Sequence, residues 1–131
     1  MAYESFENLE VWKSGCRVAV RIYEILKTCK DYGLKDQMTR AAVSVPSNIA
    51  EGAERDSKLE FIRFLHIAKG SAAELRTQVY IARQIGAIDE DIQKELVEEL
   101  KTLSAMLHGL IKSIQKHLPK KANPKHVTPK T

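Results

Sequence analysis

The sequence predicts an all-α protein, an antiparallel up-down four-helix bundle that is followed by a disordered basic C-terminal tail. Three observations lead to this fold class. Apolar residues recur three and four positions apart over long stretches, glycines divide those stretches, and the composition is 44% hydrophobic but only 6% aromatic. The 131 residues fit a single domain with one core. We place the bundle in residues 1–117 and the tail in residues 118–131.

Three glycines mark the expected junctions between helices. Gly33, Gly52 and Gly86 each lie between two amphipathic stretches. Glycine readily adopts the left-handed conformation that ends many helices. Three junctions imply four helices.

The first predicted helix covers residues 8–29 and has a wide apolar face. Val11, Trp12 and Val18 flank its main stripe, so we expect them to lie between subunits of an oligomer. The second predicted helix covers residues 35–51 and contains Pro46, which removes one backbone donor. Because the apolar stripe keeps its register across the proline, we favour one kinked helix over two shorter ones.

The last two predicted helices carry the clearest signals. Residues 57–60 read as a capping box, and a heptad pattern of apolar residues runs from there to about residue 85. The fourth helix covers residues 90–117, with Asp89 as its cap. Its acids gather in the first half and its lysines in the second, which complements the helix dipole.

The sequence lacks the motifs that carry catalysis. It has no G-x-S-x-G, no phosphate-binding loop, no dinucleotide-binding glycine pattern and no H-E-x-x-H, and its four histidines have no metal-ligand spacing. We therefore expect no enzyme activity, no catalytic residue, no metal and no cofactor.

The cysteines and the hydropathy of the chain indicate the cellular compartment to expect. Cys16 and Cys29 fall on one predicted helix, about 20 Å apart at about 1.5 Å per residue, so they cannot bond to each other. No apolar run approaches the roughly 20 residues of a membrane span. A cytoplasmic protein with no membrane contact is the expectation.

The net charge of +4 belongs to the tail. Residues 118–131 contain four lysines and no acid, so residues 1–117 hold equal numbers of basic and acidic residues. Those lysines are Lys120, Lys121, Lys125 and Lys130. If the protein binds RNA or DNA, we expect this arm to contribute more than the neutral body.

One row of basic residues stands out within the predicted bundle. Lys69, Arg76 and Arg83 recur every seven residues, with Tyr80 between the last two, and Arg63 extends the row. Cations with an interleaved aromatic suit phosphate contact and base stacking. A solvated helix face looks the same in sequence, so both interpretations stay open.

A longer pattern resembles a known family. The pattern opens with Phe-x-x-Leu-x-Val-Trp at residues 6–12 and continues from residue 32 to residue 75 with Arg40-Ala41-Ala42, Asn48-Ile49-Ala50-Glu51-Gly52, Arg55, Gly70-Ser71 and Glu74-Leu75. It resembles the bacterial four-helix-bundle proteins of the 23S rRNA intervening-sequence protein family.

The resemblance implies an assembly and a set of partners. It implies a ring-like homopentamer. The sequence pattern is also similar to that of the accessory proteins of diversity-generating retroelements, which bind nucleic acid and a reverse transcriptase. The partners we therefore expect are further copies of the chain, RNA or DNA, and a reverse transcriptase or another protein. The resulting hypothesis is a non-enzymatic oligomer that binds RNA or DNA by non-specific electrostatics. The alternative is a protein–protein interaction scaffold with no nucleic-acid role.

The polar residues of the pattern have two interpretations. We favour a structural polar network that ties the second and third helices together, and a ligand site is the alternative. These residues are Arg40, Asn48, Glu51, Arg55 and Glu74.

Overall fold

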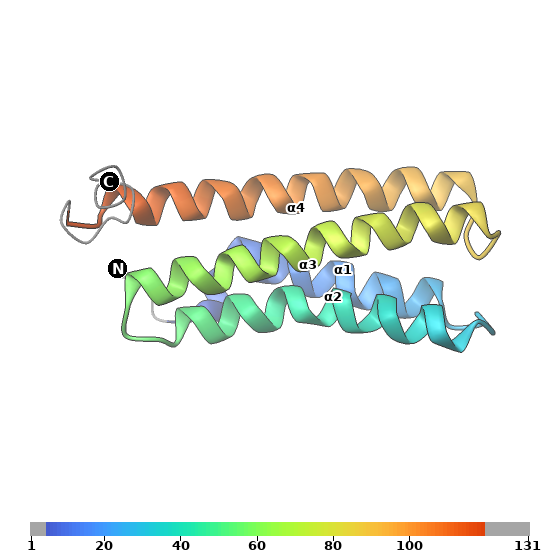
Figure 1. The fold of residues 1–131 in the computed structure, drawn as a ribbon, viewed down its shortest axis with the longest axis horizontal. Helices are drawn as coiled ribbons and strands as arrows, with labels where there is room; N and C mark the ends of the chain where they lie inside the picture. Colours follow the sequence, from blue (N-terminus) through green and yellow to red (C-terminus); the bar gives the residue numbers. More distant parts are fainter. Residues whose placement is uncertain (1–4, 120–131) are drawn as a thin grey trace, which may run out of the picture.

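Four long helices form the protein, and a computed structural model describes residues 5–119. A short 3₁₀-helix, η1 (Phe6–Asn8), precedes α1 (Glu10–Ile25), α2 (Tyr32–Ala53), α3 (Lys58–Gln84) and α4 (Glu90–Lys116). The helices run up and down beside one another (Figure 1). The predicted all-α architecture is confirmed, with no strand in the described part of the chain.

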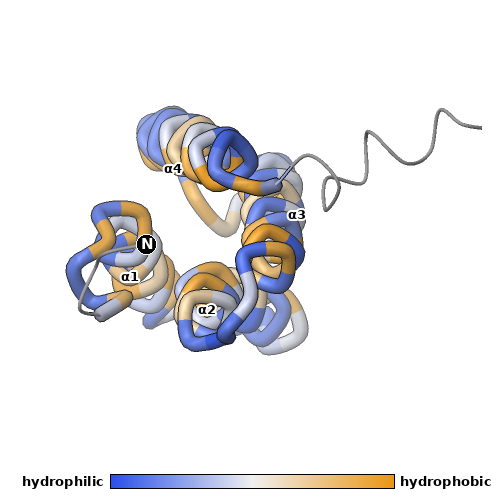
Figure 2. The backbone as a smooth tube through the Cα atoms, turned by 90° about the vertical axis from the view of Figure 1, so that its left-hand side faces the viewer, coloured by the Kyte–Doolittle hydropathy of each residue, from blue (hydrophilic) through white to orange (hydrophobic). Residues whose placement is uncertain are grey.

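The helices pack in chain order, each against the next. Figure 2 looks along the bundle and shows α1 and α3 at opposite corners, with α2 between them on one side. α1 and α4 are the two outer helices of this order. A salt bridge joins these two outer helices, from Arg21 Nη2 to Glu95 Oε1 at 2.8 Å.

Side-chain caps fix where three of the helices begin. Ser57 Oγ accepts a hydrogen bond from the Glu60 amide at 3.1 Å, and Asp89 Oδ1 accepts from the Ile92 amide at 2.9 Å. Both caps were predicted and are confirmed. Asp31, which the sequence did not single out, caps α2 in the same way.

The prediction that three glycines lie at the junctions between helices is correct for Gly86 and wrong for Gly33 and Gly52. Gly86 has a φ of 81° and ends α3 through the left-handed region. Gly33 instead lies in the first turn of α2, because the Asp31 cap starts that helix before it. Gly52 is helical and buried near the end of α2. The helix therefore extends beyond the predicted range of 35–51 at both ends.

Pro46 lies inside a single continuous helix, as predicted. Its ring is buried and lies beside Gly15 of α1. A Cβ atom on Gly15 of α1 would lie 3.4 Å from Pro46 Cδ and 3.4 Å from Val45 Cγ1. The small residue in α1 thus makes room for the ring in α2.

The end of α1 differs from its prediction. α1 stops at Ile25 rather than residue 29, and the chain leaves it through a turn in which the Lys27 amide donates to the Glu24 carbonyl. Cys29 therefore lies beyond the helix that holds Cys16. Both cysteines are free.

The core is aliphatic and continuous, as the composition predicts. It takes the heptad stripe of α3 and a leucine-rich stripe of α4. Val11 and Val18 of α1 are also buried within it, 5% and 4% exposed, so placing them between subunits was wrong. Trp12 is half-buried and meets the Phe6 ring edge-on, with ring centroids 5.3 Å apart. The core stripe of α1 is therefore wider than the sequence interpretation allowed.

Candidate nucleic-acid interface

The basic row of α3 lies along the border with α4. Lys69, Arg76 and Arg83 share one side of α3, because residues seven apart in a helix lie on the same face. Lys69 Nζ is 3.5 Å from Nδ1 of His108, which belongs to α4. None of the three α3 cations forms an ion pair within residues 5–119.

A second basic row on α4 runs beside the first. Lys94, Lys101 and His108 are also seven residues apart, so they share one face of α4. The helices are antiparallel and His108 lies beside Lys69. Helical spacing then puts Lys101 level with Arg76. Lys94 pairs with Glu90 at 3.5 Å, whereas Lys101 has no ion pair in the described chain.

We call this surface the basic seam and define it by five residues. They are Lys69, Arg76 and Arg83 of α3 with Lys101 and His108 of α4. Sequence reasoning found the α3 members and missed the α4 members. The signal was present, since both rows repeat every seven residues, but only the antiparallel packing brings the rows together.

Arg63 does not belong to the seam. It donates two hydrogen bonds to the Glu60 carboxylate, at 3.2 Å from Nε and 3.1 Å from Nη2. Its guanidinium also lies 4.6 Å from the centroid of the Phe64 ring. The hydrogen bond from Arg63 lowers the pKa of Glu60 below its ordinary value. Arg63 is thus occupied at the α2–α3 junction, although the sequence placed it in the basic row.

The four tail lysines lie outside the described residues. Lys120, Lys121, Lys125 and Lys130 all follow Pro119, where the description ends. Tyr80, expected between Arg76 and Arg83, is exposed at 44% and available for stacking.

Two of the polar pattern residues, Glu51 and Arg55, hold the α2–α3 junction together. Arg55 donates to Glu51 at 3.3 Å and reaches Glu60 of α3 at 3.9 Å. Arg55 also lies 4.9 Å from the Phe64 ring centroid, so Phe64 has two guanidiniums beside its ring. This ion-pair network joins the end of α2 to the start of α3, as the structural interpretation expects for Glu51 and Arg55.

Asn48 forms the next tie between these helices. Its Nδ2 donates to the backbone oxygen of Ser44 at 2.8 Å and to Ser44 Oγ at 2.9 Å. Ser44 Oγ in turn lies 2.8 Å from Ser71 Oγ of α3. Arg40 pairs with Asp36 of its own helix at 2.9 Å, and Glu74 is exposed without an ion pair within residues 5–119. The pattern residues thus lie along α2 and its border with α3, away from the basic seam.

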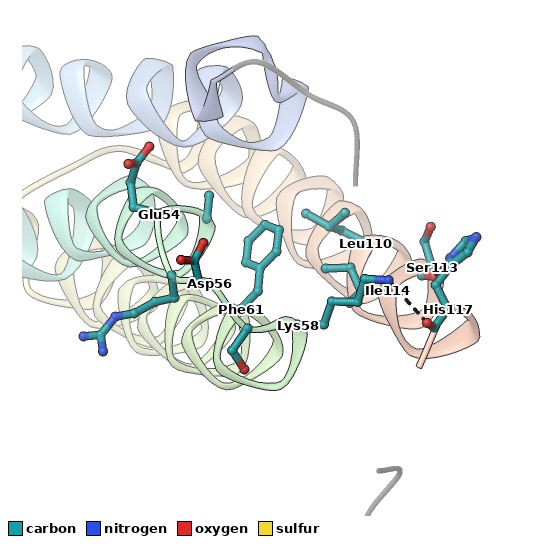
Figure 3. A pocket seen from close by; sticks show the side chains of 11 residues that line it. Glu54, Asp56, Lys58, Phe61, Leu110, Ser113, Ile114 and His117 are labelled. Atoms are coloured by element: carbon teal, nitrogen blue, oxygen red, sulfur yellow. Dashed lines mark hydrogen bonds between the residues drawn. The ribbon is translucent and has the colours of Figure 1, made fainter. Parts of the chain in front are cut away.

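An open cleft of about 670 Å³ lies at one end of the bundle, between the α2–α3 turn and the last turns of α4 (Figure 3). Phe61, Leu110 and Ile114 supply apolar walls, and Lys58 Nζ donates to the His117 carbonyl at 3.3 Å. His117 directs Nδ1 to the backbone oxygen of Ser113 at 2.9 Å. The cleft includes none of the residues of the basic seam.

Between residues 5 and 119, no three histidine, cysteine or carboxylate side chains gather in a way that would hold a metal ion. Over the same residues, no helix combines the length and the apolar character that crossing a membrane requires.

The fold and the seam define a class, a four-helix protein with an aliphatic core and a basic border between two of its helices. Residues 7–109 match the model of a family described as 23S rRNA-intervening sequence protein. The chain belongs to this family.

One solved structure supports the fold. A protein of unknown function from the S23 ribosomal protein family of Bacteroides thetaiotaomicron VPI-5482 superposes with a TM-score of 0.73. The likeness covers 78% of this chain and 98% of that one, at 24% sequence identity. At that identity the likeness shows the fold alone. No curated protein matches the chain.

Proposed function

We propose that this protein is a non-enzymatic, oligomeric nucleic-acid-binding protein that contacts RNA or DNA phosphates through the basic seam and the lysine-rich tail. The observation that carries the proposal is the pairing of two basic rows across α3 and α4. Cations without ion pairs that are spaced one heptad apart along adjacent helices form a positive strip. Such a strip can contact successive phosphates of a nucleic acid, which single surface lysines cannot.

The basic seam is locally positive although residues 1–117 have no net charge. The chain contains 17 acidic residues, and several of them form ion pairs with cations that lie outside the basic seam. Arg76, Arg83 and Lys101 remain without ion pairs in the described part of the chain. Over a Debye length of about 8 Å, local charge matters more than the net charge of the molecule.

Binding of this kind is sequence-independent. Lysine and arginine contacts to phosphate position a nucleic acid but carry no base information. Oligomerisation multiplies a weak seam into several parallel ones, and avidity then raises the overall affinity without any new contact. The tail adds four further lysines to each subunit.

Fluorescence anisotropy with a 20-nucleotide single-stranded RNA at low salt tests the proposal. We expect the intact chain to bind, and an Arg76→Gln/Arg83→Gln variant to bind less well. A Lys13→Gln/Arg40→Gln variant removes two cations that already pair with Glu10 and Asp36, so it serves as the matched control. Removing residues 120–131 deletes four lysines, and we expect it to weaken binding most.

The control separates a seam from a general charge effect. Equal losses in the two double variants would contradict the seam. Absence of RNA binding by the intact chain at low salt would contradict the nucleic-acid function as a whole.

A protein-interaction scaffold is the second candidate, and one observation favours it. Nine large apolar side chains within residues 5–119 are at least 40% exposed, among them Tyr23, Ile81 and Ile85. Exposed apolar side chains that lie on one helix face, as Ile81 and Ile85 do on α3, are typical of protein contacts. Light scattering at micromolar concentration tests the oligomer shared by both candidates, and a mass equal to the 14.8 kDa monomer would contradict it.

A further inference from the structure

Tyr80 is an exposed aromatic residue on α3 beside the basic seam. It follows Arg76 by four residues and precedes Arg83 by three, and residues at these spacings are neighbours on a helix surface. At about 1.5 Å per residue, Tyr80 lies about 6 Å from Arg76 and about 4.5 Å from Arg83 along the helix axis. One cation of the seam therefore stands on either side of the aromatic residue.

The ring of Tyr80 is open to a ligand. Tyr80 is 44% exposed, and its side chain makes no hydrogen bond, ring contact or cation–π contact within residues 5–119. Phe64, by contrast, has two arginine guanidiniums beside its ring. Arg76 and Arg83 do not cover Tyr80 in this way, and neither forms an ion pair in the described chain. The ring and both guanidiniums are therefore unoccupied there.

Small side chains surround the side of α3 over which this ring leans. A long helical side chain leans over the turn that precedes it. For Tyr80 that turn contains Thr77, and Ala73 lies one turn further back. Thr77 Oγ1 donates to the Ala73 carbonyl at 3.0 Å, so it stays close to the backbone. A Cβ atom on Gly70, one turn before Ala73, would meet nothing within 4 Å. This surface has room for a planar base beside the ring.

Unpaired bases are the ligands that such a ring can accept. In a duplex each base is stacked on its neighbours, and extruding one costs free energy. In a single strand a base can stack on an aromatic side chain whatever its identity, because every base has a π-face. The phosphates on either side of the stacked nucleotide then come within reach of Arg76 and Arg83.

We infer that Tyr80 is a base-stacking platform, through which the basic seam binds single-stranded nucleic acid in preference to a duplex. The inference rests on the proposed function and names its class of ligand. Charge alone predicts the opposite order, because a duplex carries about twice the charge of a single strand per unit length. A preference for the single strand is therefore a signature of stacking.

The test compares a 20-nucleotide single-stranded RNA with the duplex of the same sequence, by fluorescence anisotropy at low salt. We expect the intact chain to bind the single strand at least about fivefold more tightly, which is the smaller end of what stacking one base on an aromatic ring contributes. Tyr80→Phe keeps the aromatic face and should keep the preference. Tyr80→Leu removes the face and should lose it.

Tyr32→Leu is the matched control. Tyr32 is 70% exposed in the first turn of α2, outside the basic seam, so its replacement should leave the preference unchanged. The preference is a ratio of two affinities measured on one protein, so a change in stability or assembly does not by itself alter it.

A Tyr80→Trp variant reports the contact directly. After subtraction of the Trp12 emission of the intact chain, the new indole should be quenched by the single strand and not by the duplex. An intact chain that favours the duplex, a Tyr80→Leu variant that keeps the single-strand preference, or binding of the single strand without quenching would overturn the inference alone. No binding of either RNA by the intact chain would overturn the proposed function as well.

Discussion

A Cβ atom on Gly52 would lie 2.6 Å from the Cβ atom of Phe64, so α2 and α3 approach each other here closely enough that only glycine fits. Phe64 is buried and has the guanidiniums of Arg55 and Arg63 beside its ring. The close approach brings the Glu51–Arg55–Glu60–Arg63 network together at the same point. The α2–α3 junction is therefore held by packing and ion pairs together.

We expect Gly52→Ala to destabilise the protein, since overpacking of this kind costs about 1–3 kcal/mol. Thermal unfolding should show a Tm several degrees below that of the intact chain. Gly70→Ala is the control, because a Cβ atom there meets nothing within 4 Å. That variant should gain up to about 1 kcal/mol from helix propensity. Equal Tm changes in the two variants would contradict the close approach.

Glu60 predicts a pH effect on stability. Hydrogen bonding to Arg63, with the attraction of Arg63 and Arg55, lowers the pKa of Glu60 from its ordinary value of 4.5. A lowered folded-state pKa stabilises the protein above the ordinary value, and this stabilisation is lost as pH falls through the folded-state value. Glu60→Gln should therefore lower the Tm at pH 7 and lower it less at pH 3.

Glu54→Gln is the comparison for this experiment. Glu54 is exposed near the same junction and has no ion pair within residues 5–119. Its replacement should leave the Tm unchanged at both pH values. A Glu60→Gln deficit of the same size at pH 7 and pH 3 would rule out the ion pair as its cause.

The end of the folded body predicts how truncations behave. Leu118 is partly buried against the core, one residue beyond the boundary expected at 117. A chain that ends at Pro119 should keep its Tm within about 2 °C. A chain that ends at His117 loses the Leu118 contact, which at about 1 kcal/mol lowers the Tm by about 3–6 °C. If the two truncations melt together, Leu118 contributes nothing to the fold.

His108 predicts a charge-dependent change in RNA binding. His108→Asp would place a carboxylate beside Lys69 and neutralise one cation of the basic seam. An exposed ionic contact is worth up to about 1 kcal/mol, so we expect about a fivefold loss of RNA affinity at low salt. Fluorescence anisotropy measures it, and Thr102→Asp, an exposed residue six positions away on α4, is the control. An equal loss of RNA affinity in both variants would contradict a specific contribution of the position of His108 to RNA binding.

Local signals in the sequence predicted much of the fold. Asp89 and Ser57 mark their helix starts correctly because capping depends on a few consecutive residues. Gly33 misled because Asp31 caps α2 before it, so the glycine falls inside the first turn. Gly52 misled because glycine serves both to end helices and to let them approach, and the sequence does not separate these uses. The neighbour that decides the role of Gly52 is Phe64, which belongs to another helix.

The candidate site was predictable only in part, because part of it depends on contacts between different helices. The spacing of Lys69, Arg76 and Arg83 was visible along one helix. Their alignment with Lys101 and His108 depends on the register between α3 and α4, which is a property of the packed core. Arg63 was assigned to the row because of its spacing, although its partners Glu60 and Phe64 lie three residues and one residue away on the same helix and were within reach of the sequence.

The dependence of RNA affinity on salt tests the central claim most directly. Each phosphate contact to single-stranded RNA contributes about −0.7 to the slope of log affinity against log salt concentration. With Arg76 and Arg83 in contact with phosphates, the Arg76→Gln/Arg83→Gln variant should have a slope shallower by about 1.4 than the intact chain. The Lys13→Gln/Arg40→Gln control should keep the slope of the intact chain. A slope that is the same in all three proteins would contradict the basic seam as the nucleic-acid interface.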